Sequence, residues 1–177
     1  MILASVGNVL VWAVWFGAAV FFTVGAAPAV FSPDMRRLLG DNNYPYFSGA
    51  IAQVIIARYF QLQLACGIVA LLHALAEGLY FGRPLRRWGL GLLAGLFVLG
   101  LTGGFWLQPK IKTLHAARYA ANQPPAVREA KAKSLRLWHG AAQAVNLVML
   151  VGLGAYVWRV AHPASTARFV TPMKFPG

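Results

Sequence analysis

Residues 12–31 read WAVWFGAAVFFTVGAAPAVF, twenty positions without one charged side chain. A helix of about 20 apolar residues is long enough to cross the hydrocarbon core of a membrane. Aromatic residues, glycine and alanine dominate the stretch. It predicts a membrane-spanning helix, and further stretches of the same kind follow it along the chain.

The composition of the whole chain agrees with a membrane protein. Of its 177 residues, 59% are hydrophobic and 11% are charged, whereas a soluble domain carries about 25% charged residues. The net charge of +12 comes from basic residues in the predicted loops, where anionic lipid headgroups account for them. We therefore expect contact with membrane lipids and no binding of nucleic acid. The single cysteine, Cys66, excludes an intramolecular disulfide.

The first span is predicted at about residues 5–31, and three more follow at about residues 58–81, 88–107 and 135–160. Together they predict an all-α fold, an integral membrane four-helix antiparallel bundle. We expect one domain over residues 1–162 and an extended C-terminal tail at 163–177. Four spans place both termini on one side of the membrane. The connections on the opposite side carry ten Lys and Arg against six on the terminal side, which favours termini outside the cytoplasm.

Two shorter segments predict amphipathic helices at the membrane interface. Phe47–Ala57 is apolar, with Gln53 as its one strongly polar side chain, and it predicts either a helix at the interface or the lead-in to the second span. Gln108 and Pro109 are expected to end the third span. Lys110–Ala121 then mixes apolar and basic residues, as a helix lying on the membrane surface does.

Small residues recur at helical spacing within the spans, and we expect them to let helix backbones approach closely. In the third span they suggest a helix squeezed between its neighbours. The predicted packing positions are Gly17, Gly25, Ala70, Ala74, Gly78, Gly91, Gly95, Gly100 and Gly104.

His73 and Glu77 lie four residues apart and therefore on one face of the second span. Ionisable groups inside a membrane are costly and often mark function. The pair predicts a metal site, a pigment or haem ligand through His73, or a proton relay. A structural alternative stays open, in which Glu77 lies within a turn of the span's end and His73 bonds to a neighbouring helix.

His139, Gln143 and Asn146 form a polar stripe on the fourth span. The stripe predicts either a polar site facing His73 or hydrogen bonds between helices. His73 lies near mid-span and His139 near an end, which argues against direct pairing. Four basic residues on one side of the membrane are predicted to contact an anionic headgroup or a partner, or simply to face solvent: Arg58, Lys110, Lys112 and Arg136.

Several landmarks occur in a familiar order. They are Trp15-Phe-Gly17, Ala27-Pro-Ala-Val-Phe31, Arg58-Tyr-Phe60, Gln108-Pro-Lys-Ile111 and His139-Gly140. In this respect the chain resembles the transmembrane protein 205-like family over about residues 10–160. The resemblance implies a four-helix membrane domain of unknown function with no catalytic residues to carry over. Because the family is widespread in bacteria, we expect the bacterial inner membrane as the location.

We expect a non-enzymatic integral membrane protein that serves as a structural or accessory subunit of a larger membrane complex. Its partners would be membrane lipids and other membrane protein subunits. One alternative is a small transporter or metal-handling protein whose site uses His73, Glu77, Gln143 and Asn146. Another is a pigment- or haem-binding subunit through His73. The sequence assigns no cofactor. The alternative is that the protein binds a lipid or a pigment.

Overall fold

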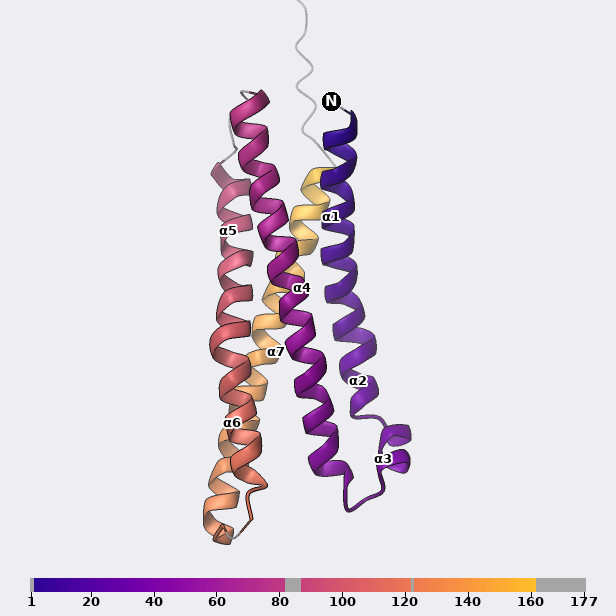
Figure 1. Ribbon diagram of the computed structural model, residues 1–177, viewed down its shortest axis with the longest axis vertical. Coiled ribbons are helices and arrows are strands. Elements are labelled where there is room, and N and C mark those ends of the chain that lie inside the picture. The colour runs from indigo at the N-terminus through magenta and orange to yellow at the C-terminus, as the bar shows by residue number, and fades with distance from the viewer. Residues whose placement is uncertain (1, 82–86, 122, 162–177) are drawn as a thin grey trace, which may run out of the picture.

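A computed structural model describes residues 2–81, 87–121 and 123–161, which are helical almost throughout and contain no strand (Figure 1). In these residues four helical stretches are long and apolar enough to cross a membrane. They confirm the predicted all-α membrane bundle. The elements are α1 (Ile2–Phe21), the π-helical turn η1 (Phe22–Ala26), α2 (Ala27–Val30), α3 (Pro33–Leu39), α4 (Tyr44–Phe81), α5 (Arg87–Thr102), the π-helical turn η2 (Gly103–Leu107), α6 (Gln108–Arg118) and α7 (Pro125–Ala161).

The four long helices alternate in direction along the bundle. One runs from α1 through η1 to α2, the second is α4, the third runs from α5 through η2 to α6, and the fourth is α7 (Figure 1). Helix α4 packs against α1 and α5, while α7 packs against α1, α5 and α6. The start of α1 and the end of α7 lie at the same end of the bundle. The predicted tail, 163–177, lies outside the described residues.

Two of the long helices extend further than the sequence predicted. Phe47–Ala57 lies inside α4, so it is the lead-in to the second span rather than a separate helix. The predicted end of the third helix at Gln108 and Pro109 is wrong, because α6 continues directly from η2. Helix α6 is nevertheless amphipathic, with Ile111 buried and Lys112 exposed.

A π-helical turn explains why the chain stays helical across Pro28 and Pro109. Proline lacks an N–H group and clashes with the carbonyl group four residues earlier. In each case the proline is the second residue after a π-helical turn. The N–H of Ala27 bonds to the carbonyl of Phe22, and the N–H of Gln108 to that of Gly103. This wider i→i−5 pattern loosens the backbone just before the proline, so both helices continue.

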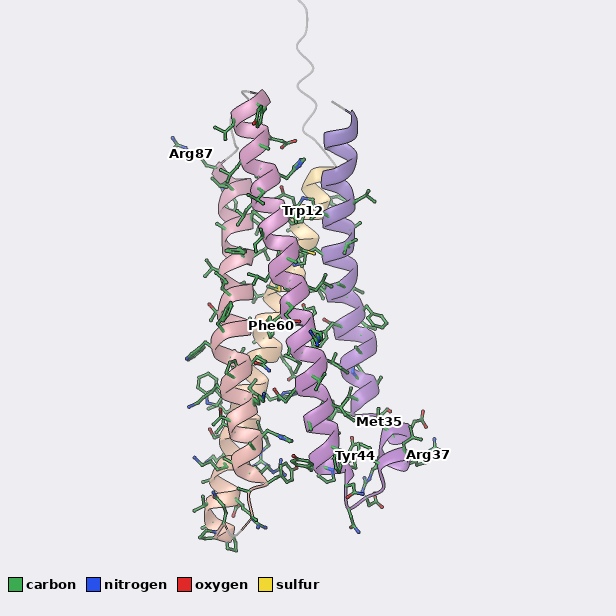
Figure 2. All side chains as sticks on the ribbon, viewed as in Figure 1. Trp12, Met35, Arg37, Tyr44, Phe60 and Arg87 are labelled. Atoms are coloured by element: carbon green, nitrogen blue, oxygen red, sulfur yellow. The ribbon has the colours of Figure 1, made fainter. Side chains whose placement is uncertain are left out.

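The core lies in the half of the bundle nearest the termini. Trp15 is 0% exposed, and its Nε1 donates a hydrogen bond to Oε1 of the buried Gln63. Figure 2 shows Trp12 directed into the bundle and Arg87 directed away from it. The remaining buried residues of this cluster are Ala19, Tyr59, Cys66, Ala70, Leu93, Leu96, Met149 and Leu153.

The glycines of the third helix fall into two groups. A methyl group at Gly103 would overlap the ring of Phe60 on α4, so this close approach requires glycine. By contrast, a methyl group at Gly91 or Gly95 would meet no heavy atom within 4 Å in the described part of the chain. The expectation that these two glycines are squeezed between neighbours within the bundle is therefore wrong. The reason is that Leu93, Leu96 and Gly100 form the packed face of α5.

Alanine substitutions at Gly103 and Gly95 test this division. We expect Gly103→Ala to lower the free energy of unfolding by about 1–3 kcal/mol, because the added methyl group overpacks the contact with Phe60. Gly95→Ala should cause no loss, because its methyl group enters open space and alanine favours the helix. Denaturant titration of the detergent-solubilised protein measures both. Equal losses at the two positions would contradict the packing described here.

Candidate functional site

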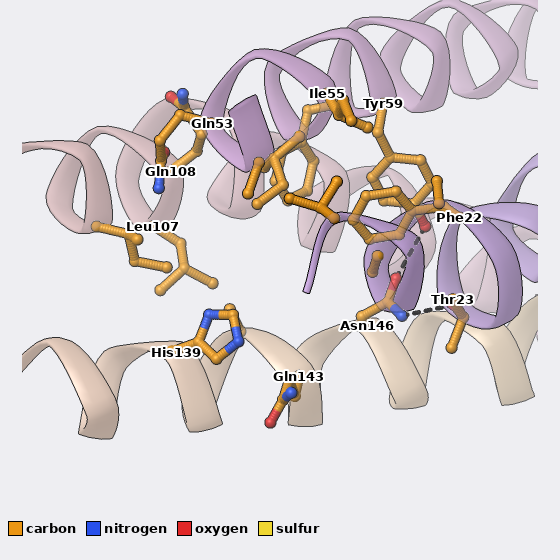
Figure 3. Close-up of a pocket in the computed structure, with 18 of the residues that line it drawn as sticks. Phe22, Thr23, Gln53, Ile55, Tyr59, Leu107, Gln108, His139, Gln143 and Asn146 are labelled. Atoms are coloured by element: carbon orange, nitrogen blue, oxygen red, sulfur yellow. Dashed lines mark hydrogen bonds between the residues drawn. The ribbon is translucent and has the colours of Figure 1, made fainter. Parts of the chain in front are cut away.

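A cavity of about 450 Å³ lies between the four long helices, in the half of the bundle away from the termini (Figure 3). Its walls come from η1 and α2, from α4, from the junction of η2 and α6, and from α7. They are largely apolar, with Phe22, Phe31 and Phe60 among the lining side chains. The core that contains Trp12 and Trp15 lies on one side of the cavity, and the helices diverge on the other side (Figure 1).

The polar groups at the deep end of the cavity bond to one another. Tyr59 Oη donates to Asn146 Oδ1 at 2.9 Å, and Asn146 Nδ2 donates to Thr23 Oγ1 at 2.8 Å (Figure 3). Thr23 Oγ1 in turn donates to the carbonyl of Ala19 at 2.7 Å. This hydrogen-bonded chain joins α4, α7 and η1. The structure thus places Asn146 in hydrogen bonds between helices, one of its two predicted roles.

The polar groups nearer the loops are arranged differently. Gln53, Gln108 and His139 all line the cavity. Oε1 of Gln53 is buried and has no hydrogen-bond partner among the described residues. Lys, Arg, Asp and Glu are all absent from the described residues that form the lining. The described lining therefore holds no permanently charged side chain, and it has an apolar middle and spare hydrogen-bonding capacity at its outer end.

The cavity opens sideways between α2 and α7. Pro28 and Phe31 on one side, and Gln143 and Leu147 on the other, belong to the lining and are exposed. Figure 3 shows Gln143 pointing away from the other lining residues, so it forms part of the rim. In a bundle that spans a membrane, such an opening faces lipid rather than water.

His73 and Glu77 lie elsewhere. Nε2 of His73 is 3.6 Å from Oε1 of Glu77, and the two side chains are 24% and 32% exposed. Along α4 the pair starts 14 residues beyond Tyr59, which is about 21 Å at 1.5 Å per residue. The structure therefore does not bring this pair together with Gln143 and Asn146. Within the described ranges, no group of three or more His, Cys, Asp or Glu is placed to hold a metal ion.

The four basic residues predicted to contact a headgroup or partner are all exposed. Arg58 donates to Oε1 of Gln61 at 3.0 Å on the exposed side of α4. Lys110 Nζ lies over the ring of Trp138, 5.9 Å from its centroid. Lys112 and Arg136 are exposed. The contacts of Arg58 and Lys110 are with different residues, and exposed side chains of this kind are typical of a solvated basic surface.

The predicted packing positions also differ in their surroundings. Ala70 and Ala74 belong to the core and its edge, and Gly78 is partly buried. A methyl group at Gly100 would lie 3.7 Å from Met149 Cε, and one at Gly104 would lie 3.3 Å from Phe60 Cβ. At Gly25 it would meet the ring of Phe21, on the same helix, at 3.3 Å. A methyl group at Gly17 would meet no heavy atom within 4 Å among the described residues, as at Gly91 and Gly95.

Sequence reasoning missed Thr23, Gln53 and Gln108 as site residues. Each is a polar side chain in an apolar surrounding, Thr23 within 12–31 and Gln53 within 47–57. A single polar residue in an apolar segment was the only signal in the sequence that these three side chains belong to a site. Their convergence on one cavity depends on helix packing, which the sequence pattern does not contain.

A double-mutant cycle tests the hydrogen bond between Tyr59 and Asn146. We expect Tyr59→Phe to destabilise the bundle, because Asn146 Oδ1 loses its donor. In an Asn146→Leu background the same substitution should cost less, with a coupling energy of about 0.6–1.7 kcal/mol. The measurement is the free energy of unfolding of the four proteins in detergent. Strictly additive effects would show that the two side chains do not interact.

Residues 10–120 match the family described as a domain of unknown function, DUF4149. The matched segment contains the three cavity walls from η1 to α6, and it ends before α7. No curated protein and no solved structure matches the chain. Since the match covers more than half of the 177 residues, this multi-pass membrane protein belongs to the DUF4149 family.

Proposed function

We propose that the protein is a non-enzymatic membrane subunit that packs against another membrane protein through α5. The surface concerned is the glycine face of α5, formed by Gly91, Ala94, Gly95 and Val98, all of which are exposed. The observation that carries the proposal is the open space at Gly91 and Gly95 within the described structure. We further propose kinship with the transmembrane protein 205-like family and a location in the bacterial inner membrane with non-cytoplasmic termini.

The two glycines on the exposed face of α5 carry an energetic cost. Glycine destabilises a helix interior by about 1 kcal/mol relative to alanine. Gly103 offsets that cost by admitting Phe60, whereas Gly91 and Gly95 admit no other side chain among the described residues. In lipid, association of helices depends on close packing, and small residues four apart allow two backbones to approach. A partner helix on the glycine face would supply the packing that the chain itself does not.

The alternatives built on His73 have less support. A transporter or metal-handling site would need donors beyond His73 and Glu77, and Gln143 and Asn146 lie in a different part of the bundle. For a pigment or haem, Nε2 of His73 would have to face the ligand. That atom is buried 3.6 Å from Glu77, so binding would require the pair to separate.

Leucine substitutions on the glycine face test the subunit proposal. We expect the native chain, extracted in mild detergent, to migrate with a partner or a second copy. Gly91→Leu combined with Gly95→Leu should release the chain as a monomer, because the larger side chains keep the partner backbone away. Ala65→Leu, at an exposed position on α4, is the matched control and should leave the complex intact. Native chain that migrates alone would refute the proposal.

A further inference from the structure

The cavity between α2, α4, α6 and α7 takes no part in packing through the glycine face of α5. Its volume of about 450 Å³ lies within the range of about 300–1,000 Å³ that small-molecule sites occupy. Its lining combines aromatic rings with a few polar side chains, which is the usual composition of such sites. It therefore needs an explanation separate from the subunit role.

The lining determines the charge of the occupant. An ionised group that leaves water for an apolar interior requires a partner of opposite charge. The described lining offers no Lys, Arg, Asp or Glu. The basic residues adjacent in sequence to lining positions are Arg58, Lys110 and Lys112; all three are exposed, and Arg58 bonds to Gln61. These surroundings fit an uncharged molecule.

The polar side chains determine where the head of that molecule lies. At the deep end, Tyr59, Asn146 and Thr23 already satisfy one another. The spare capacity lies with Gln53, Gln108 and His139, about two helical turns nearer the loops. A buried amide oxygen without a partner costs free energy, and Gln53 has one. A hydroxyl group of a ligand would donate to that oxygen, and a carbonyl group would instead accept from the NH₂ group once the amide is turned over.

The opening determines the route of entry. It lies between Phe31 on the α2 side and Leu147 on the α7 side, both apolar and exposed. In a membrane-spanning bundle this route leads into lipid. A molecule that enters there can keep an apolar chain in the bilayer while its head reaches the glutamines.

We propose that the cavity binds an uncharged, lipid-soluble molecule whose head carries carbonyl or hydroxyl oxygens. The head lies among Gln53, Gln108 and His139, and the apolar chain leaves between α2 and α7. Isoprenoid quinones and neutral glycerides share this chemistry. Both place oxygen atoms that accept hydrogen bonds next to a long hydrocarbon chain, and neither carries a charge.

Direct binding measurements test the proposal on the full chain in a mild detergent. The probes are decylubiquinone, monoolein and 1-oleoyl lysophosphatidate, and the last two differ by one phosphate group. We expect saturable binding of decylubiquinone or of monoolein, and the one that binds identifies the source of the ligand. Lysophosphatidate should bind at least about tenfold more weakly than the better neutral probe, because its phosphate finds no Lys or Arg in the described lining. Equal or tighter binding of lysophosphatidate would overturn the proposal, as would the absence of saturable binding by both neutral probes.

Two pairs of variants locate the binding in the cavity. Ala142→Phe fills the cavity and should abolish binding, whereas Ala144→Phe adds the same ring at an exposed position outside the lining and should not. Gln53→Leu should weaken binding about tenfold through loss of a buried hydrogen bond. Gln61→Leu, on the exposed side of the same helix, should leave binding unchanged. Undiminished binding by Gln53→Leu would refute the placement of the head, even if Ala142→Phe failed to fold.

Migration of the native chain with its partner is a separate measurement, so the subunit proposal and the ligand proposal can fail independently.

Discussion

The hydrogen bonds from Tyr59 through Asn146 to Thr23 hold three helices at one level of the bundle. Inside a membrane no water competes for these groups, so each must find its partner within the protein. On one side of this level the helices pack around Trp15 and Leu153, which are both fully buried. On the other side they separate and enclose the cavity. The chain of hydrogen bonds is therefore the boundary between the packed core and the cavity.

The two π-helical turns supply the backbone that this boundary requires. Thr23, which accepts the last interhelical hydrogen bond, lies in η1, and Gly103, which admits Phe60, lies in η2. Both turns lie beside neighbouring residues of α4, Tyr59 and Phe60. Wide helical turns of this kind often occur at functional sites. Here they let the helices pass Pro28 and Pro109 and continue along the cavity walls.

The sequence was sufficient for the number of spans and their antiparallel order, which puts the start of α1 and the end of α7 at one end of the bundle (Figure 1), because these follow from long runs without charge. It was not sufficient for the end of the third helix. Proline argues for a break at Pro109, and the compensating turn at Gly103–Leu107 is visible only in the backbone. The spacing of Gly91 and Gly95 predicted close packing but not its direction, since spacing does not tell which face of a helix meets its neighbours.

The candidate site was predictable only in part. The polar stripe of His139, Gln143 and Asn146 was evident from its helical spacing, and the structure places all three along the cavity. Gln53 and Gln108 are single polar residues on other helices, and their presence in the same lining as His139 depends on how α4, α6 and α7 pack. The sequence drew attention to His73 and Glu77, which are close in sequence, but the pair begins about 21 Å along the helix from the deep end of the cavity.

Taken together, these features describe a membrane bundle with an outward glycine face for a partner helix and an uncharged cavity open to lipid. Native mass spectrometry of the chain, released directly from the membranes in which it was made, tests the cavity most directly. The account predicts one retained molecule per chain, uncharged and lipid-soluble, which is lost when the cavity is filled. A chain that retains only charged phospholipid, or the same neutral molecule whether or not the cavity is filled, would contradict it.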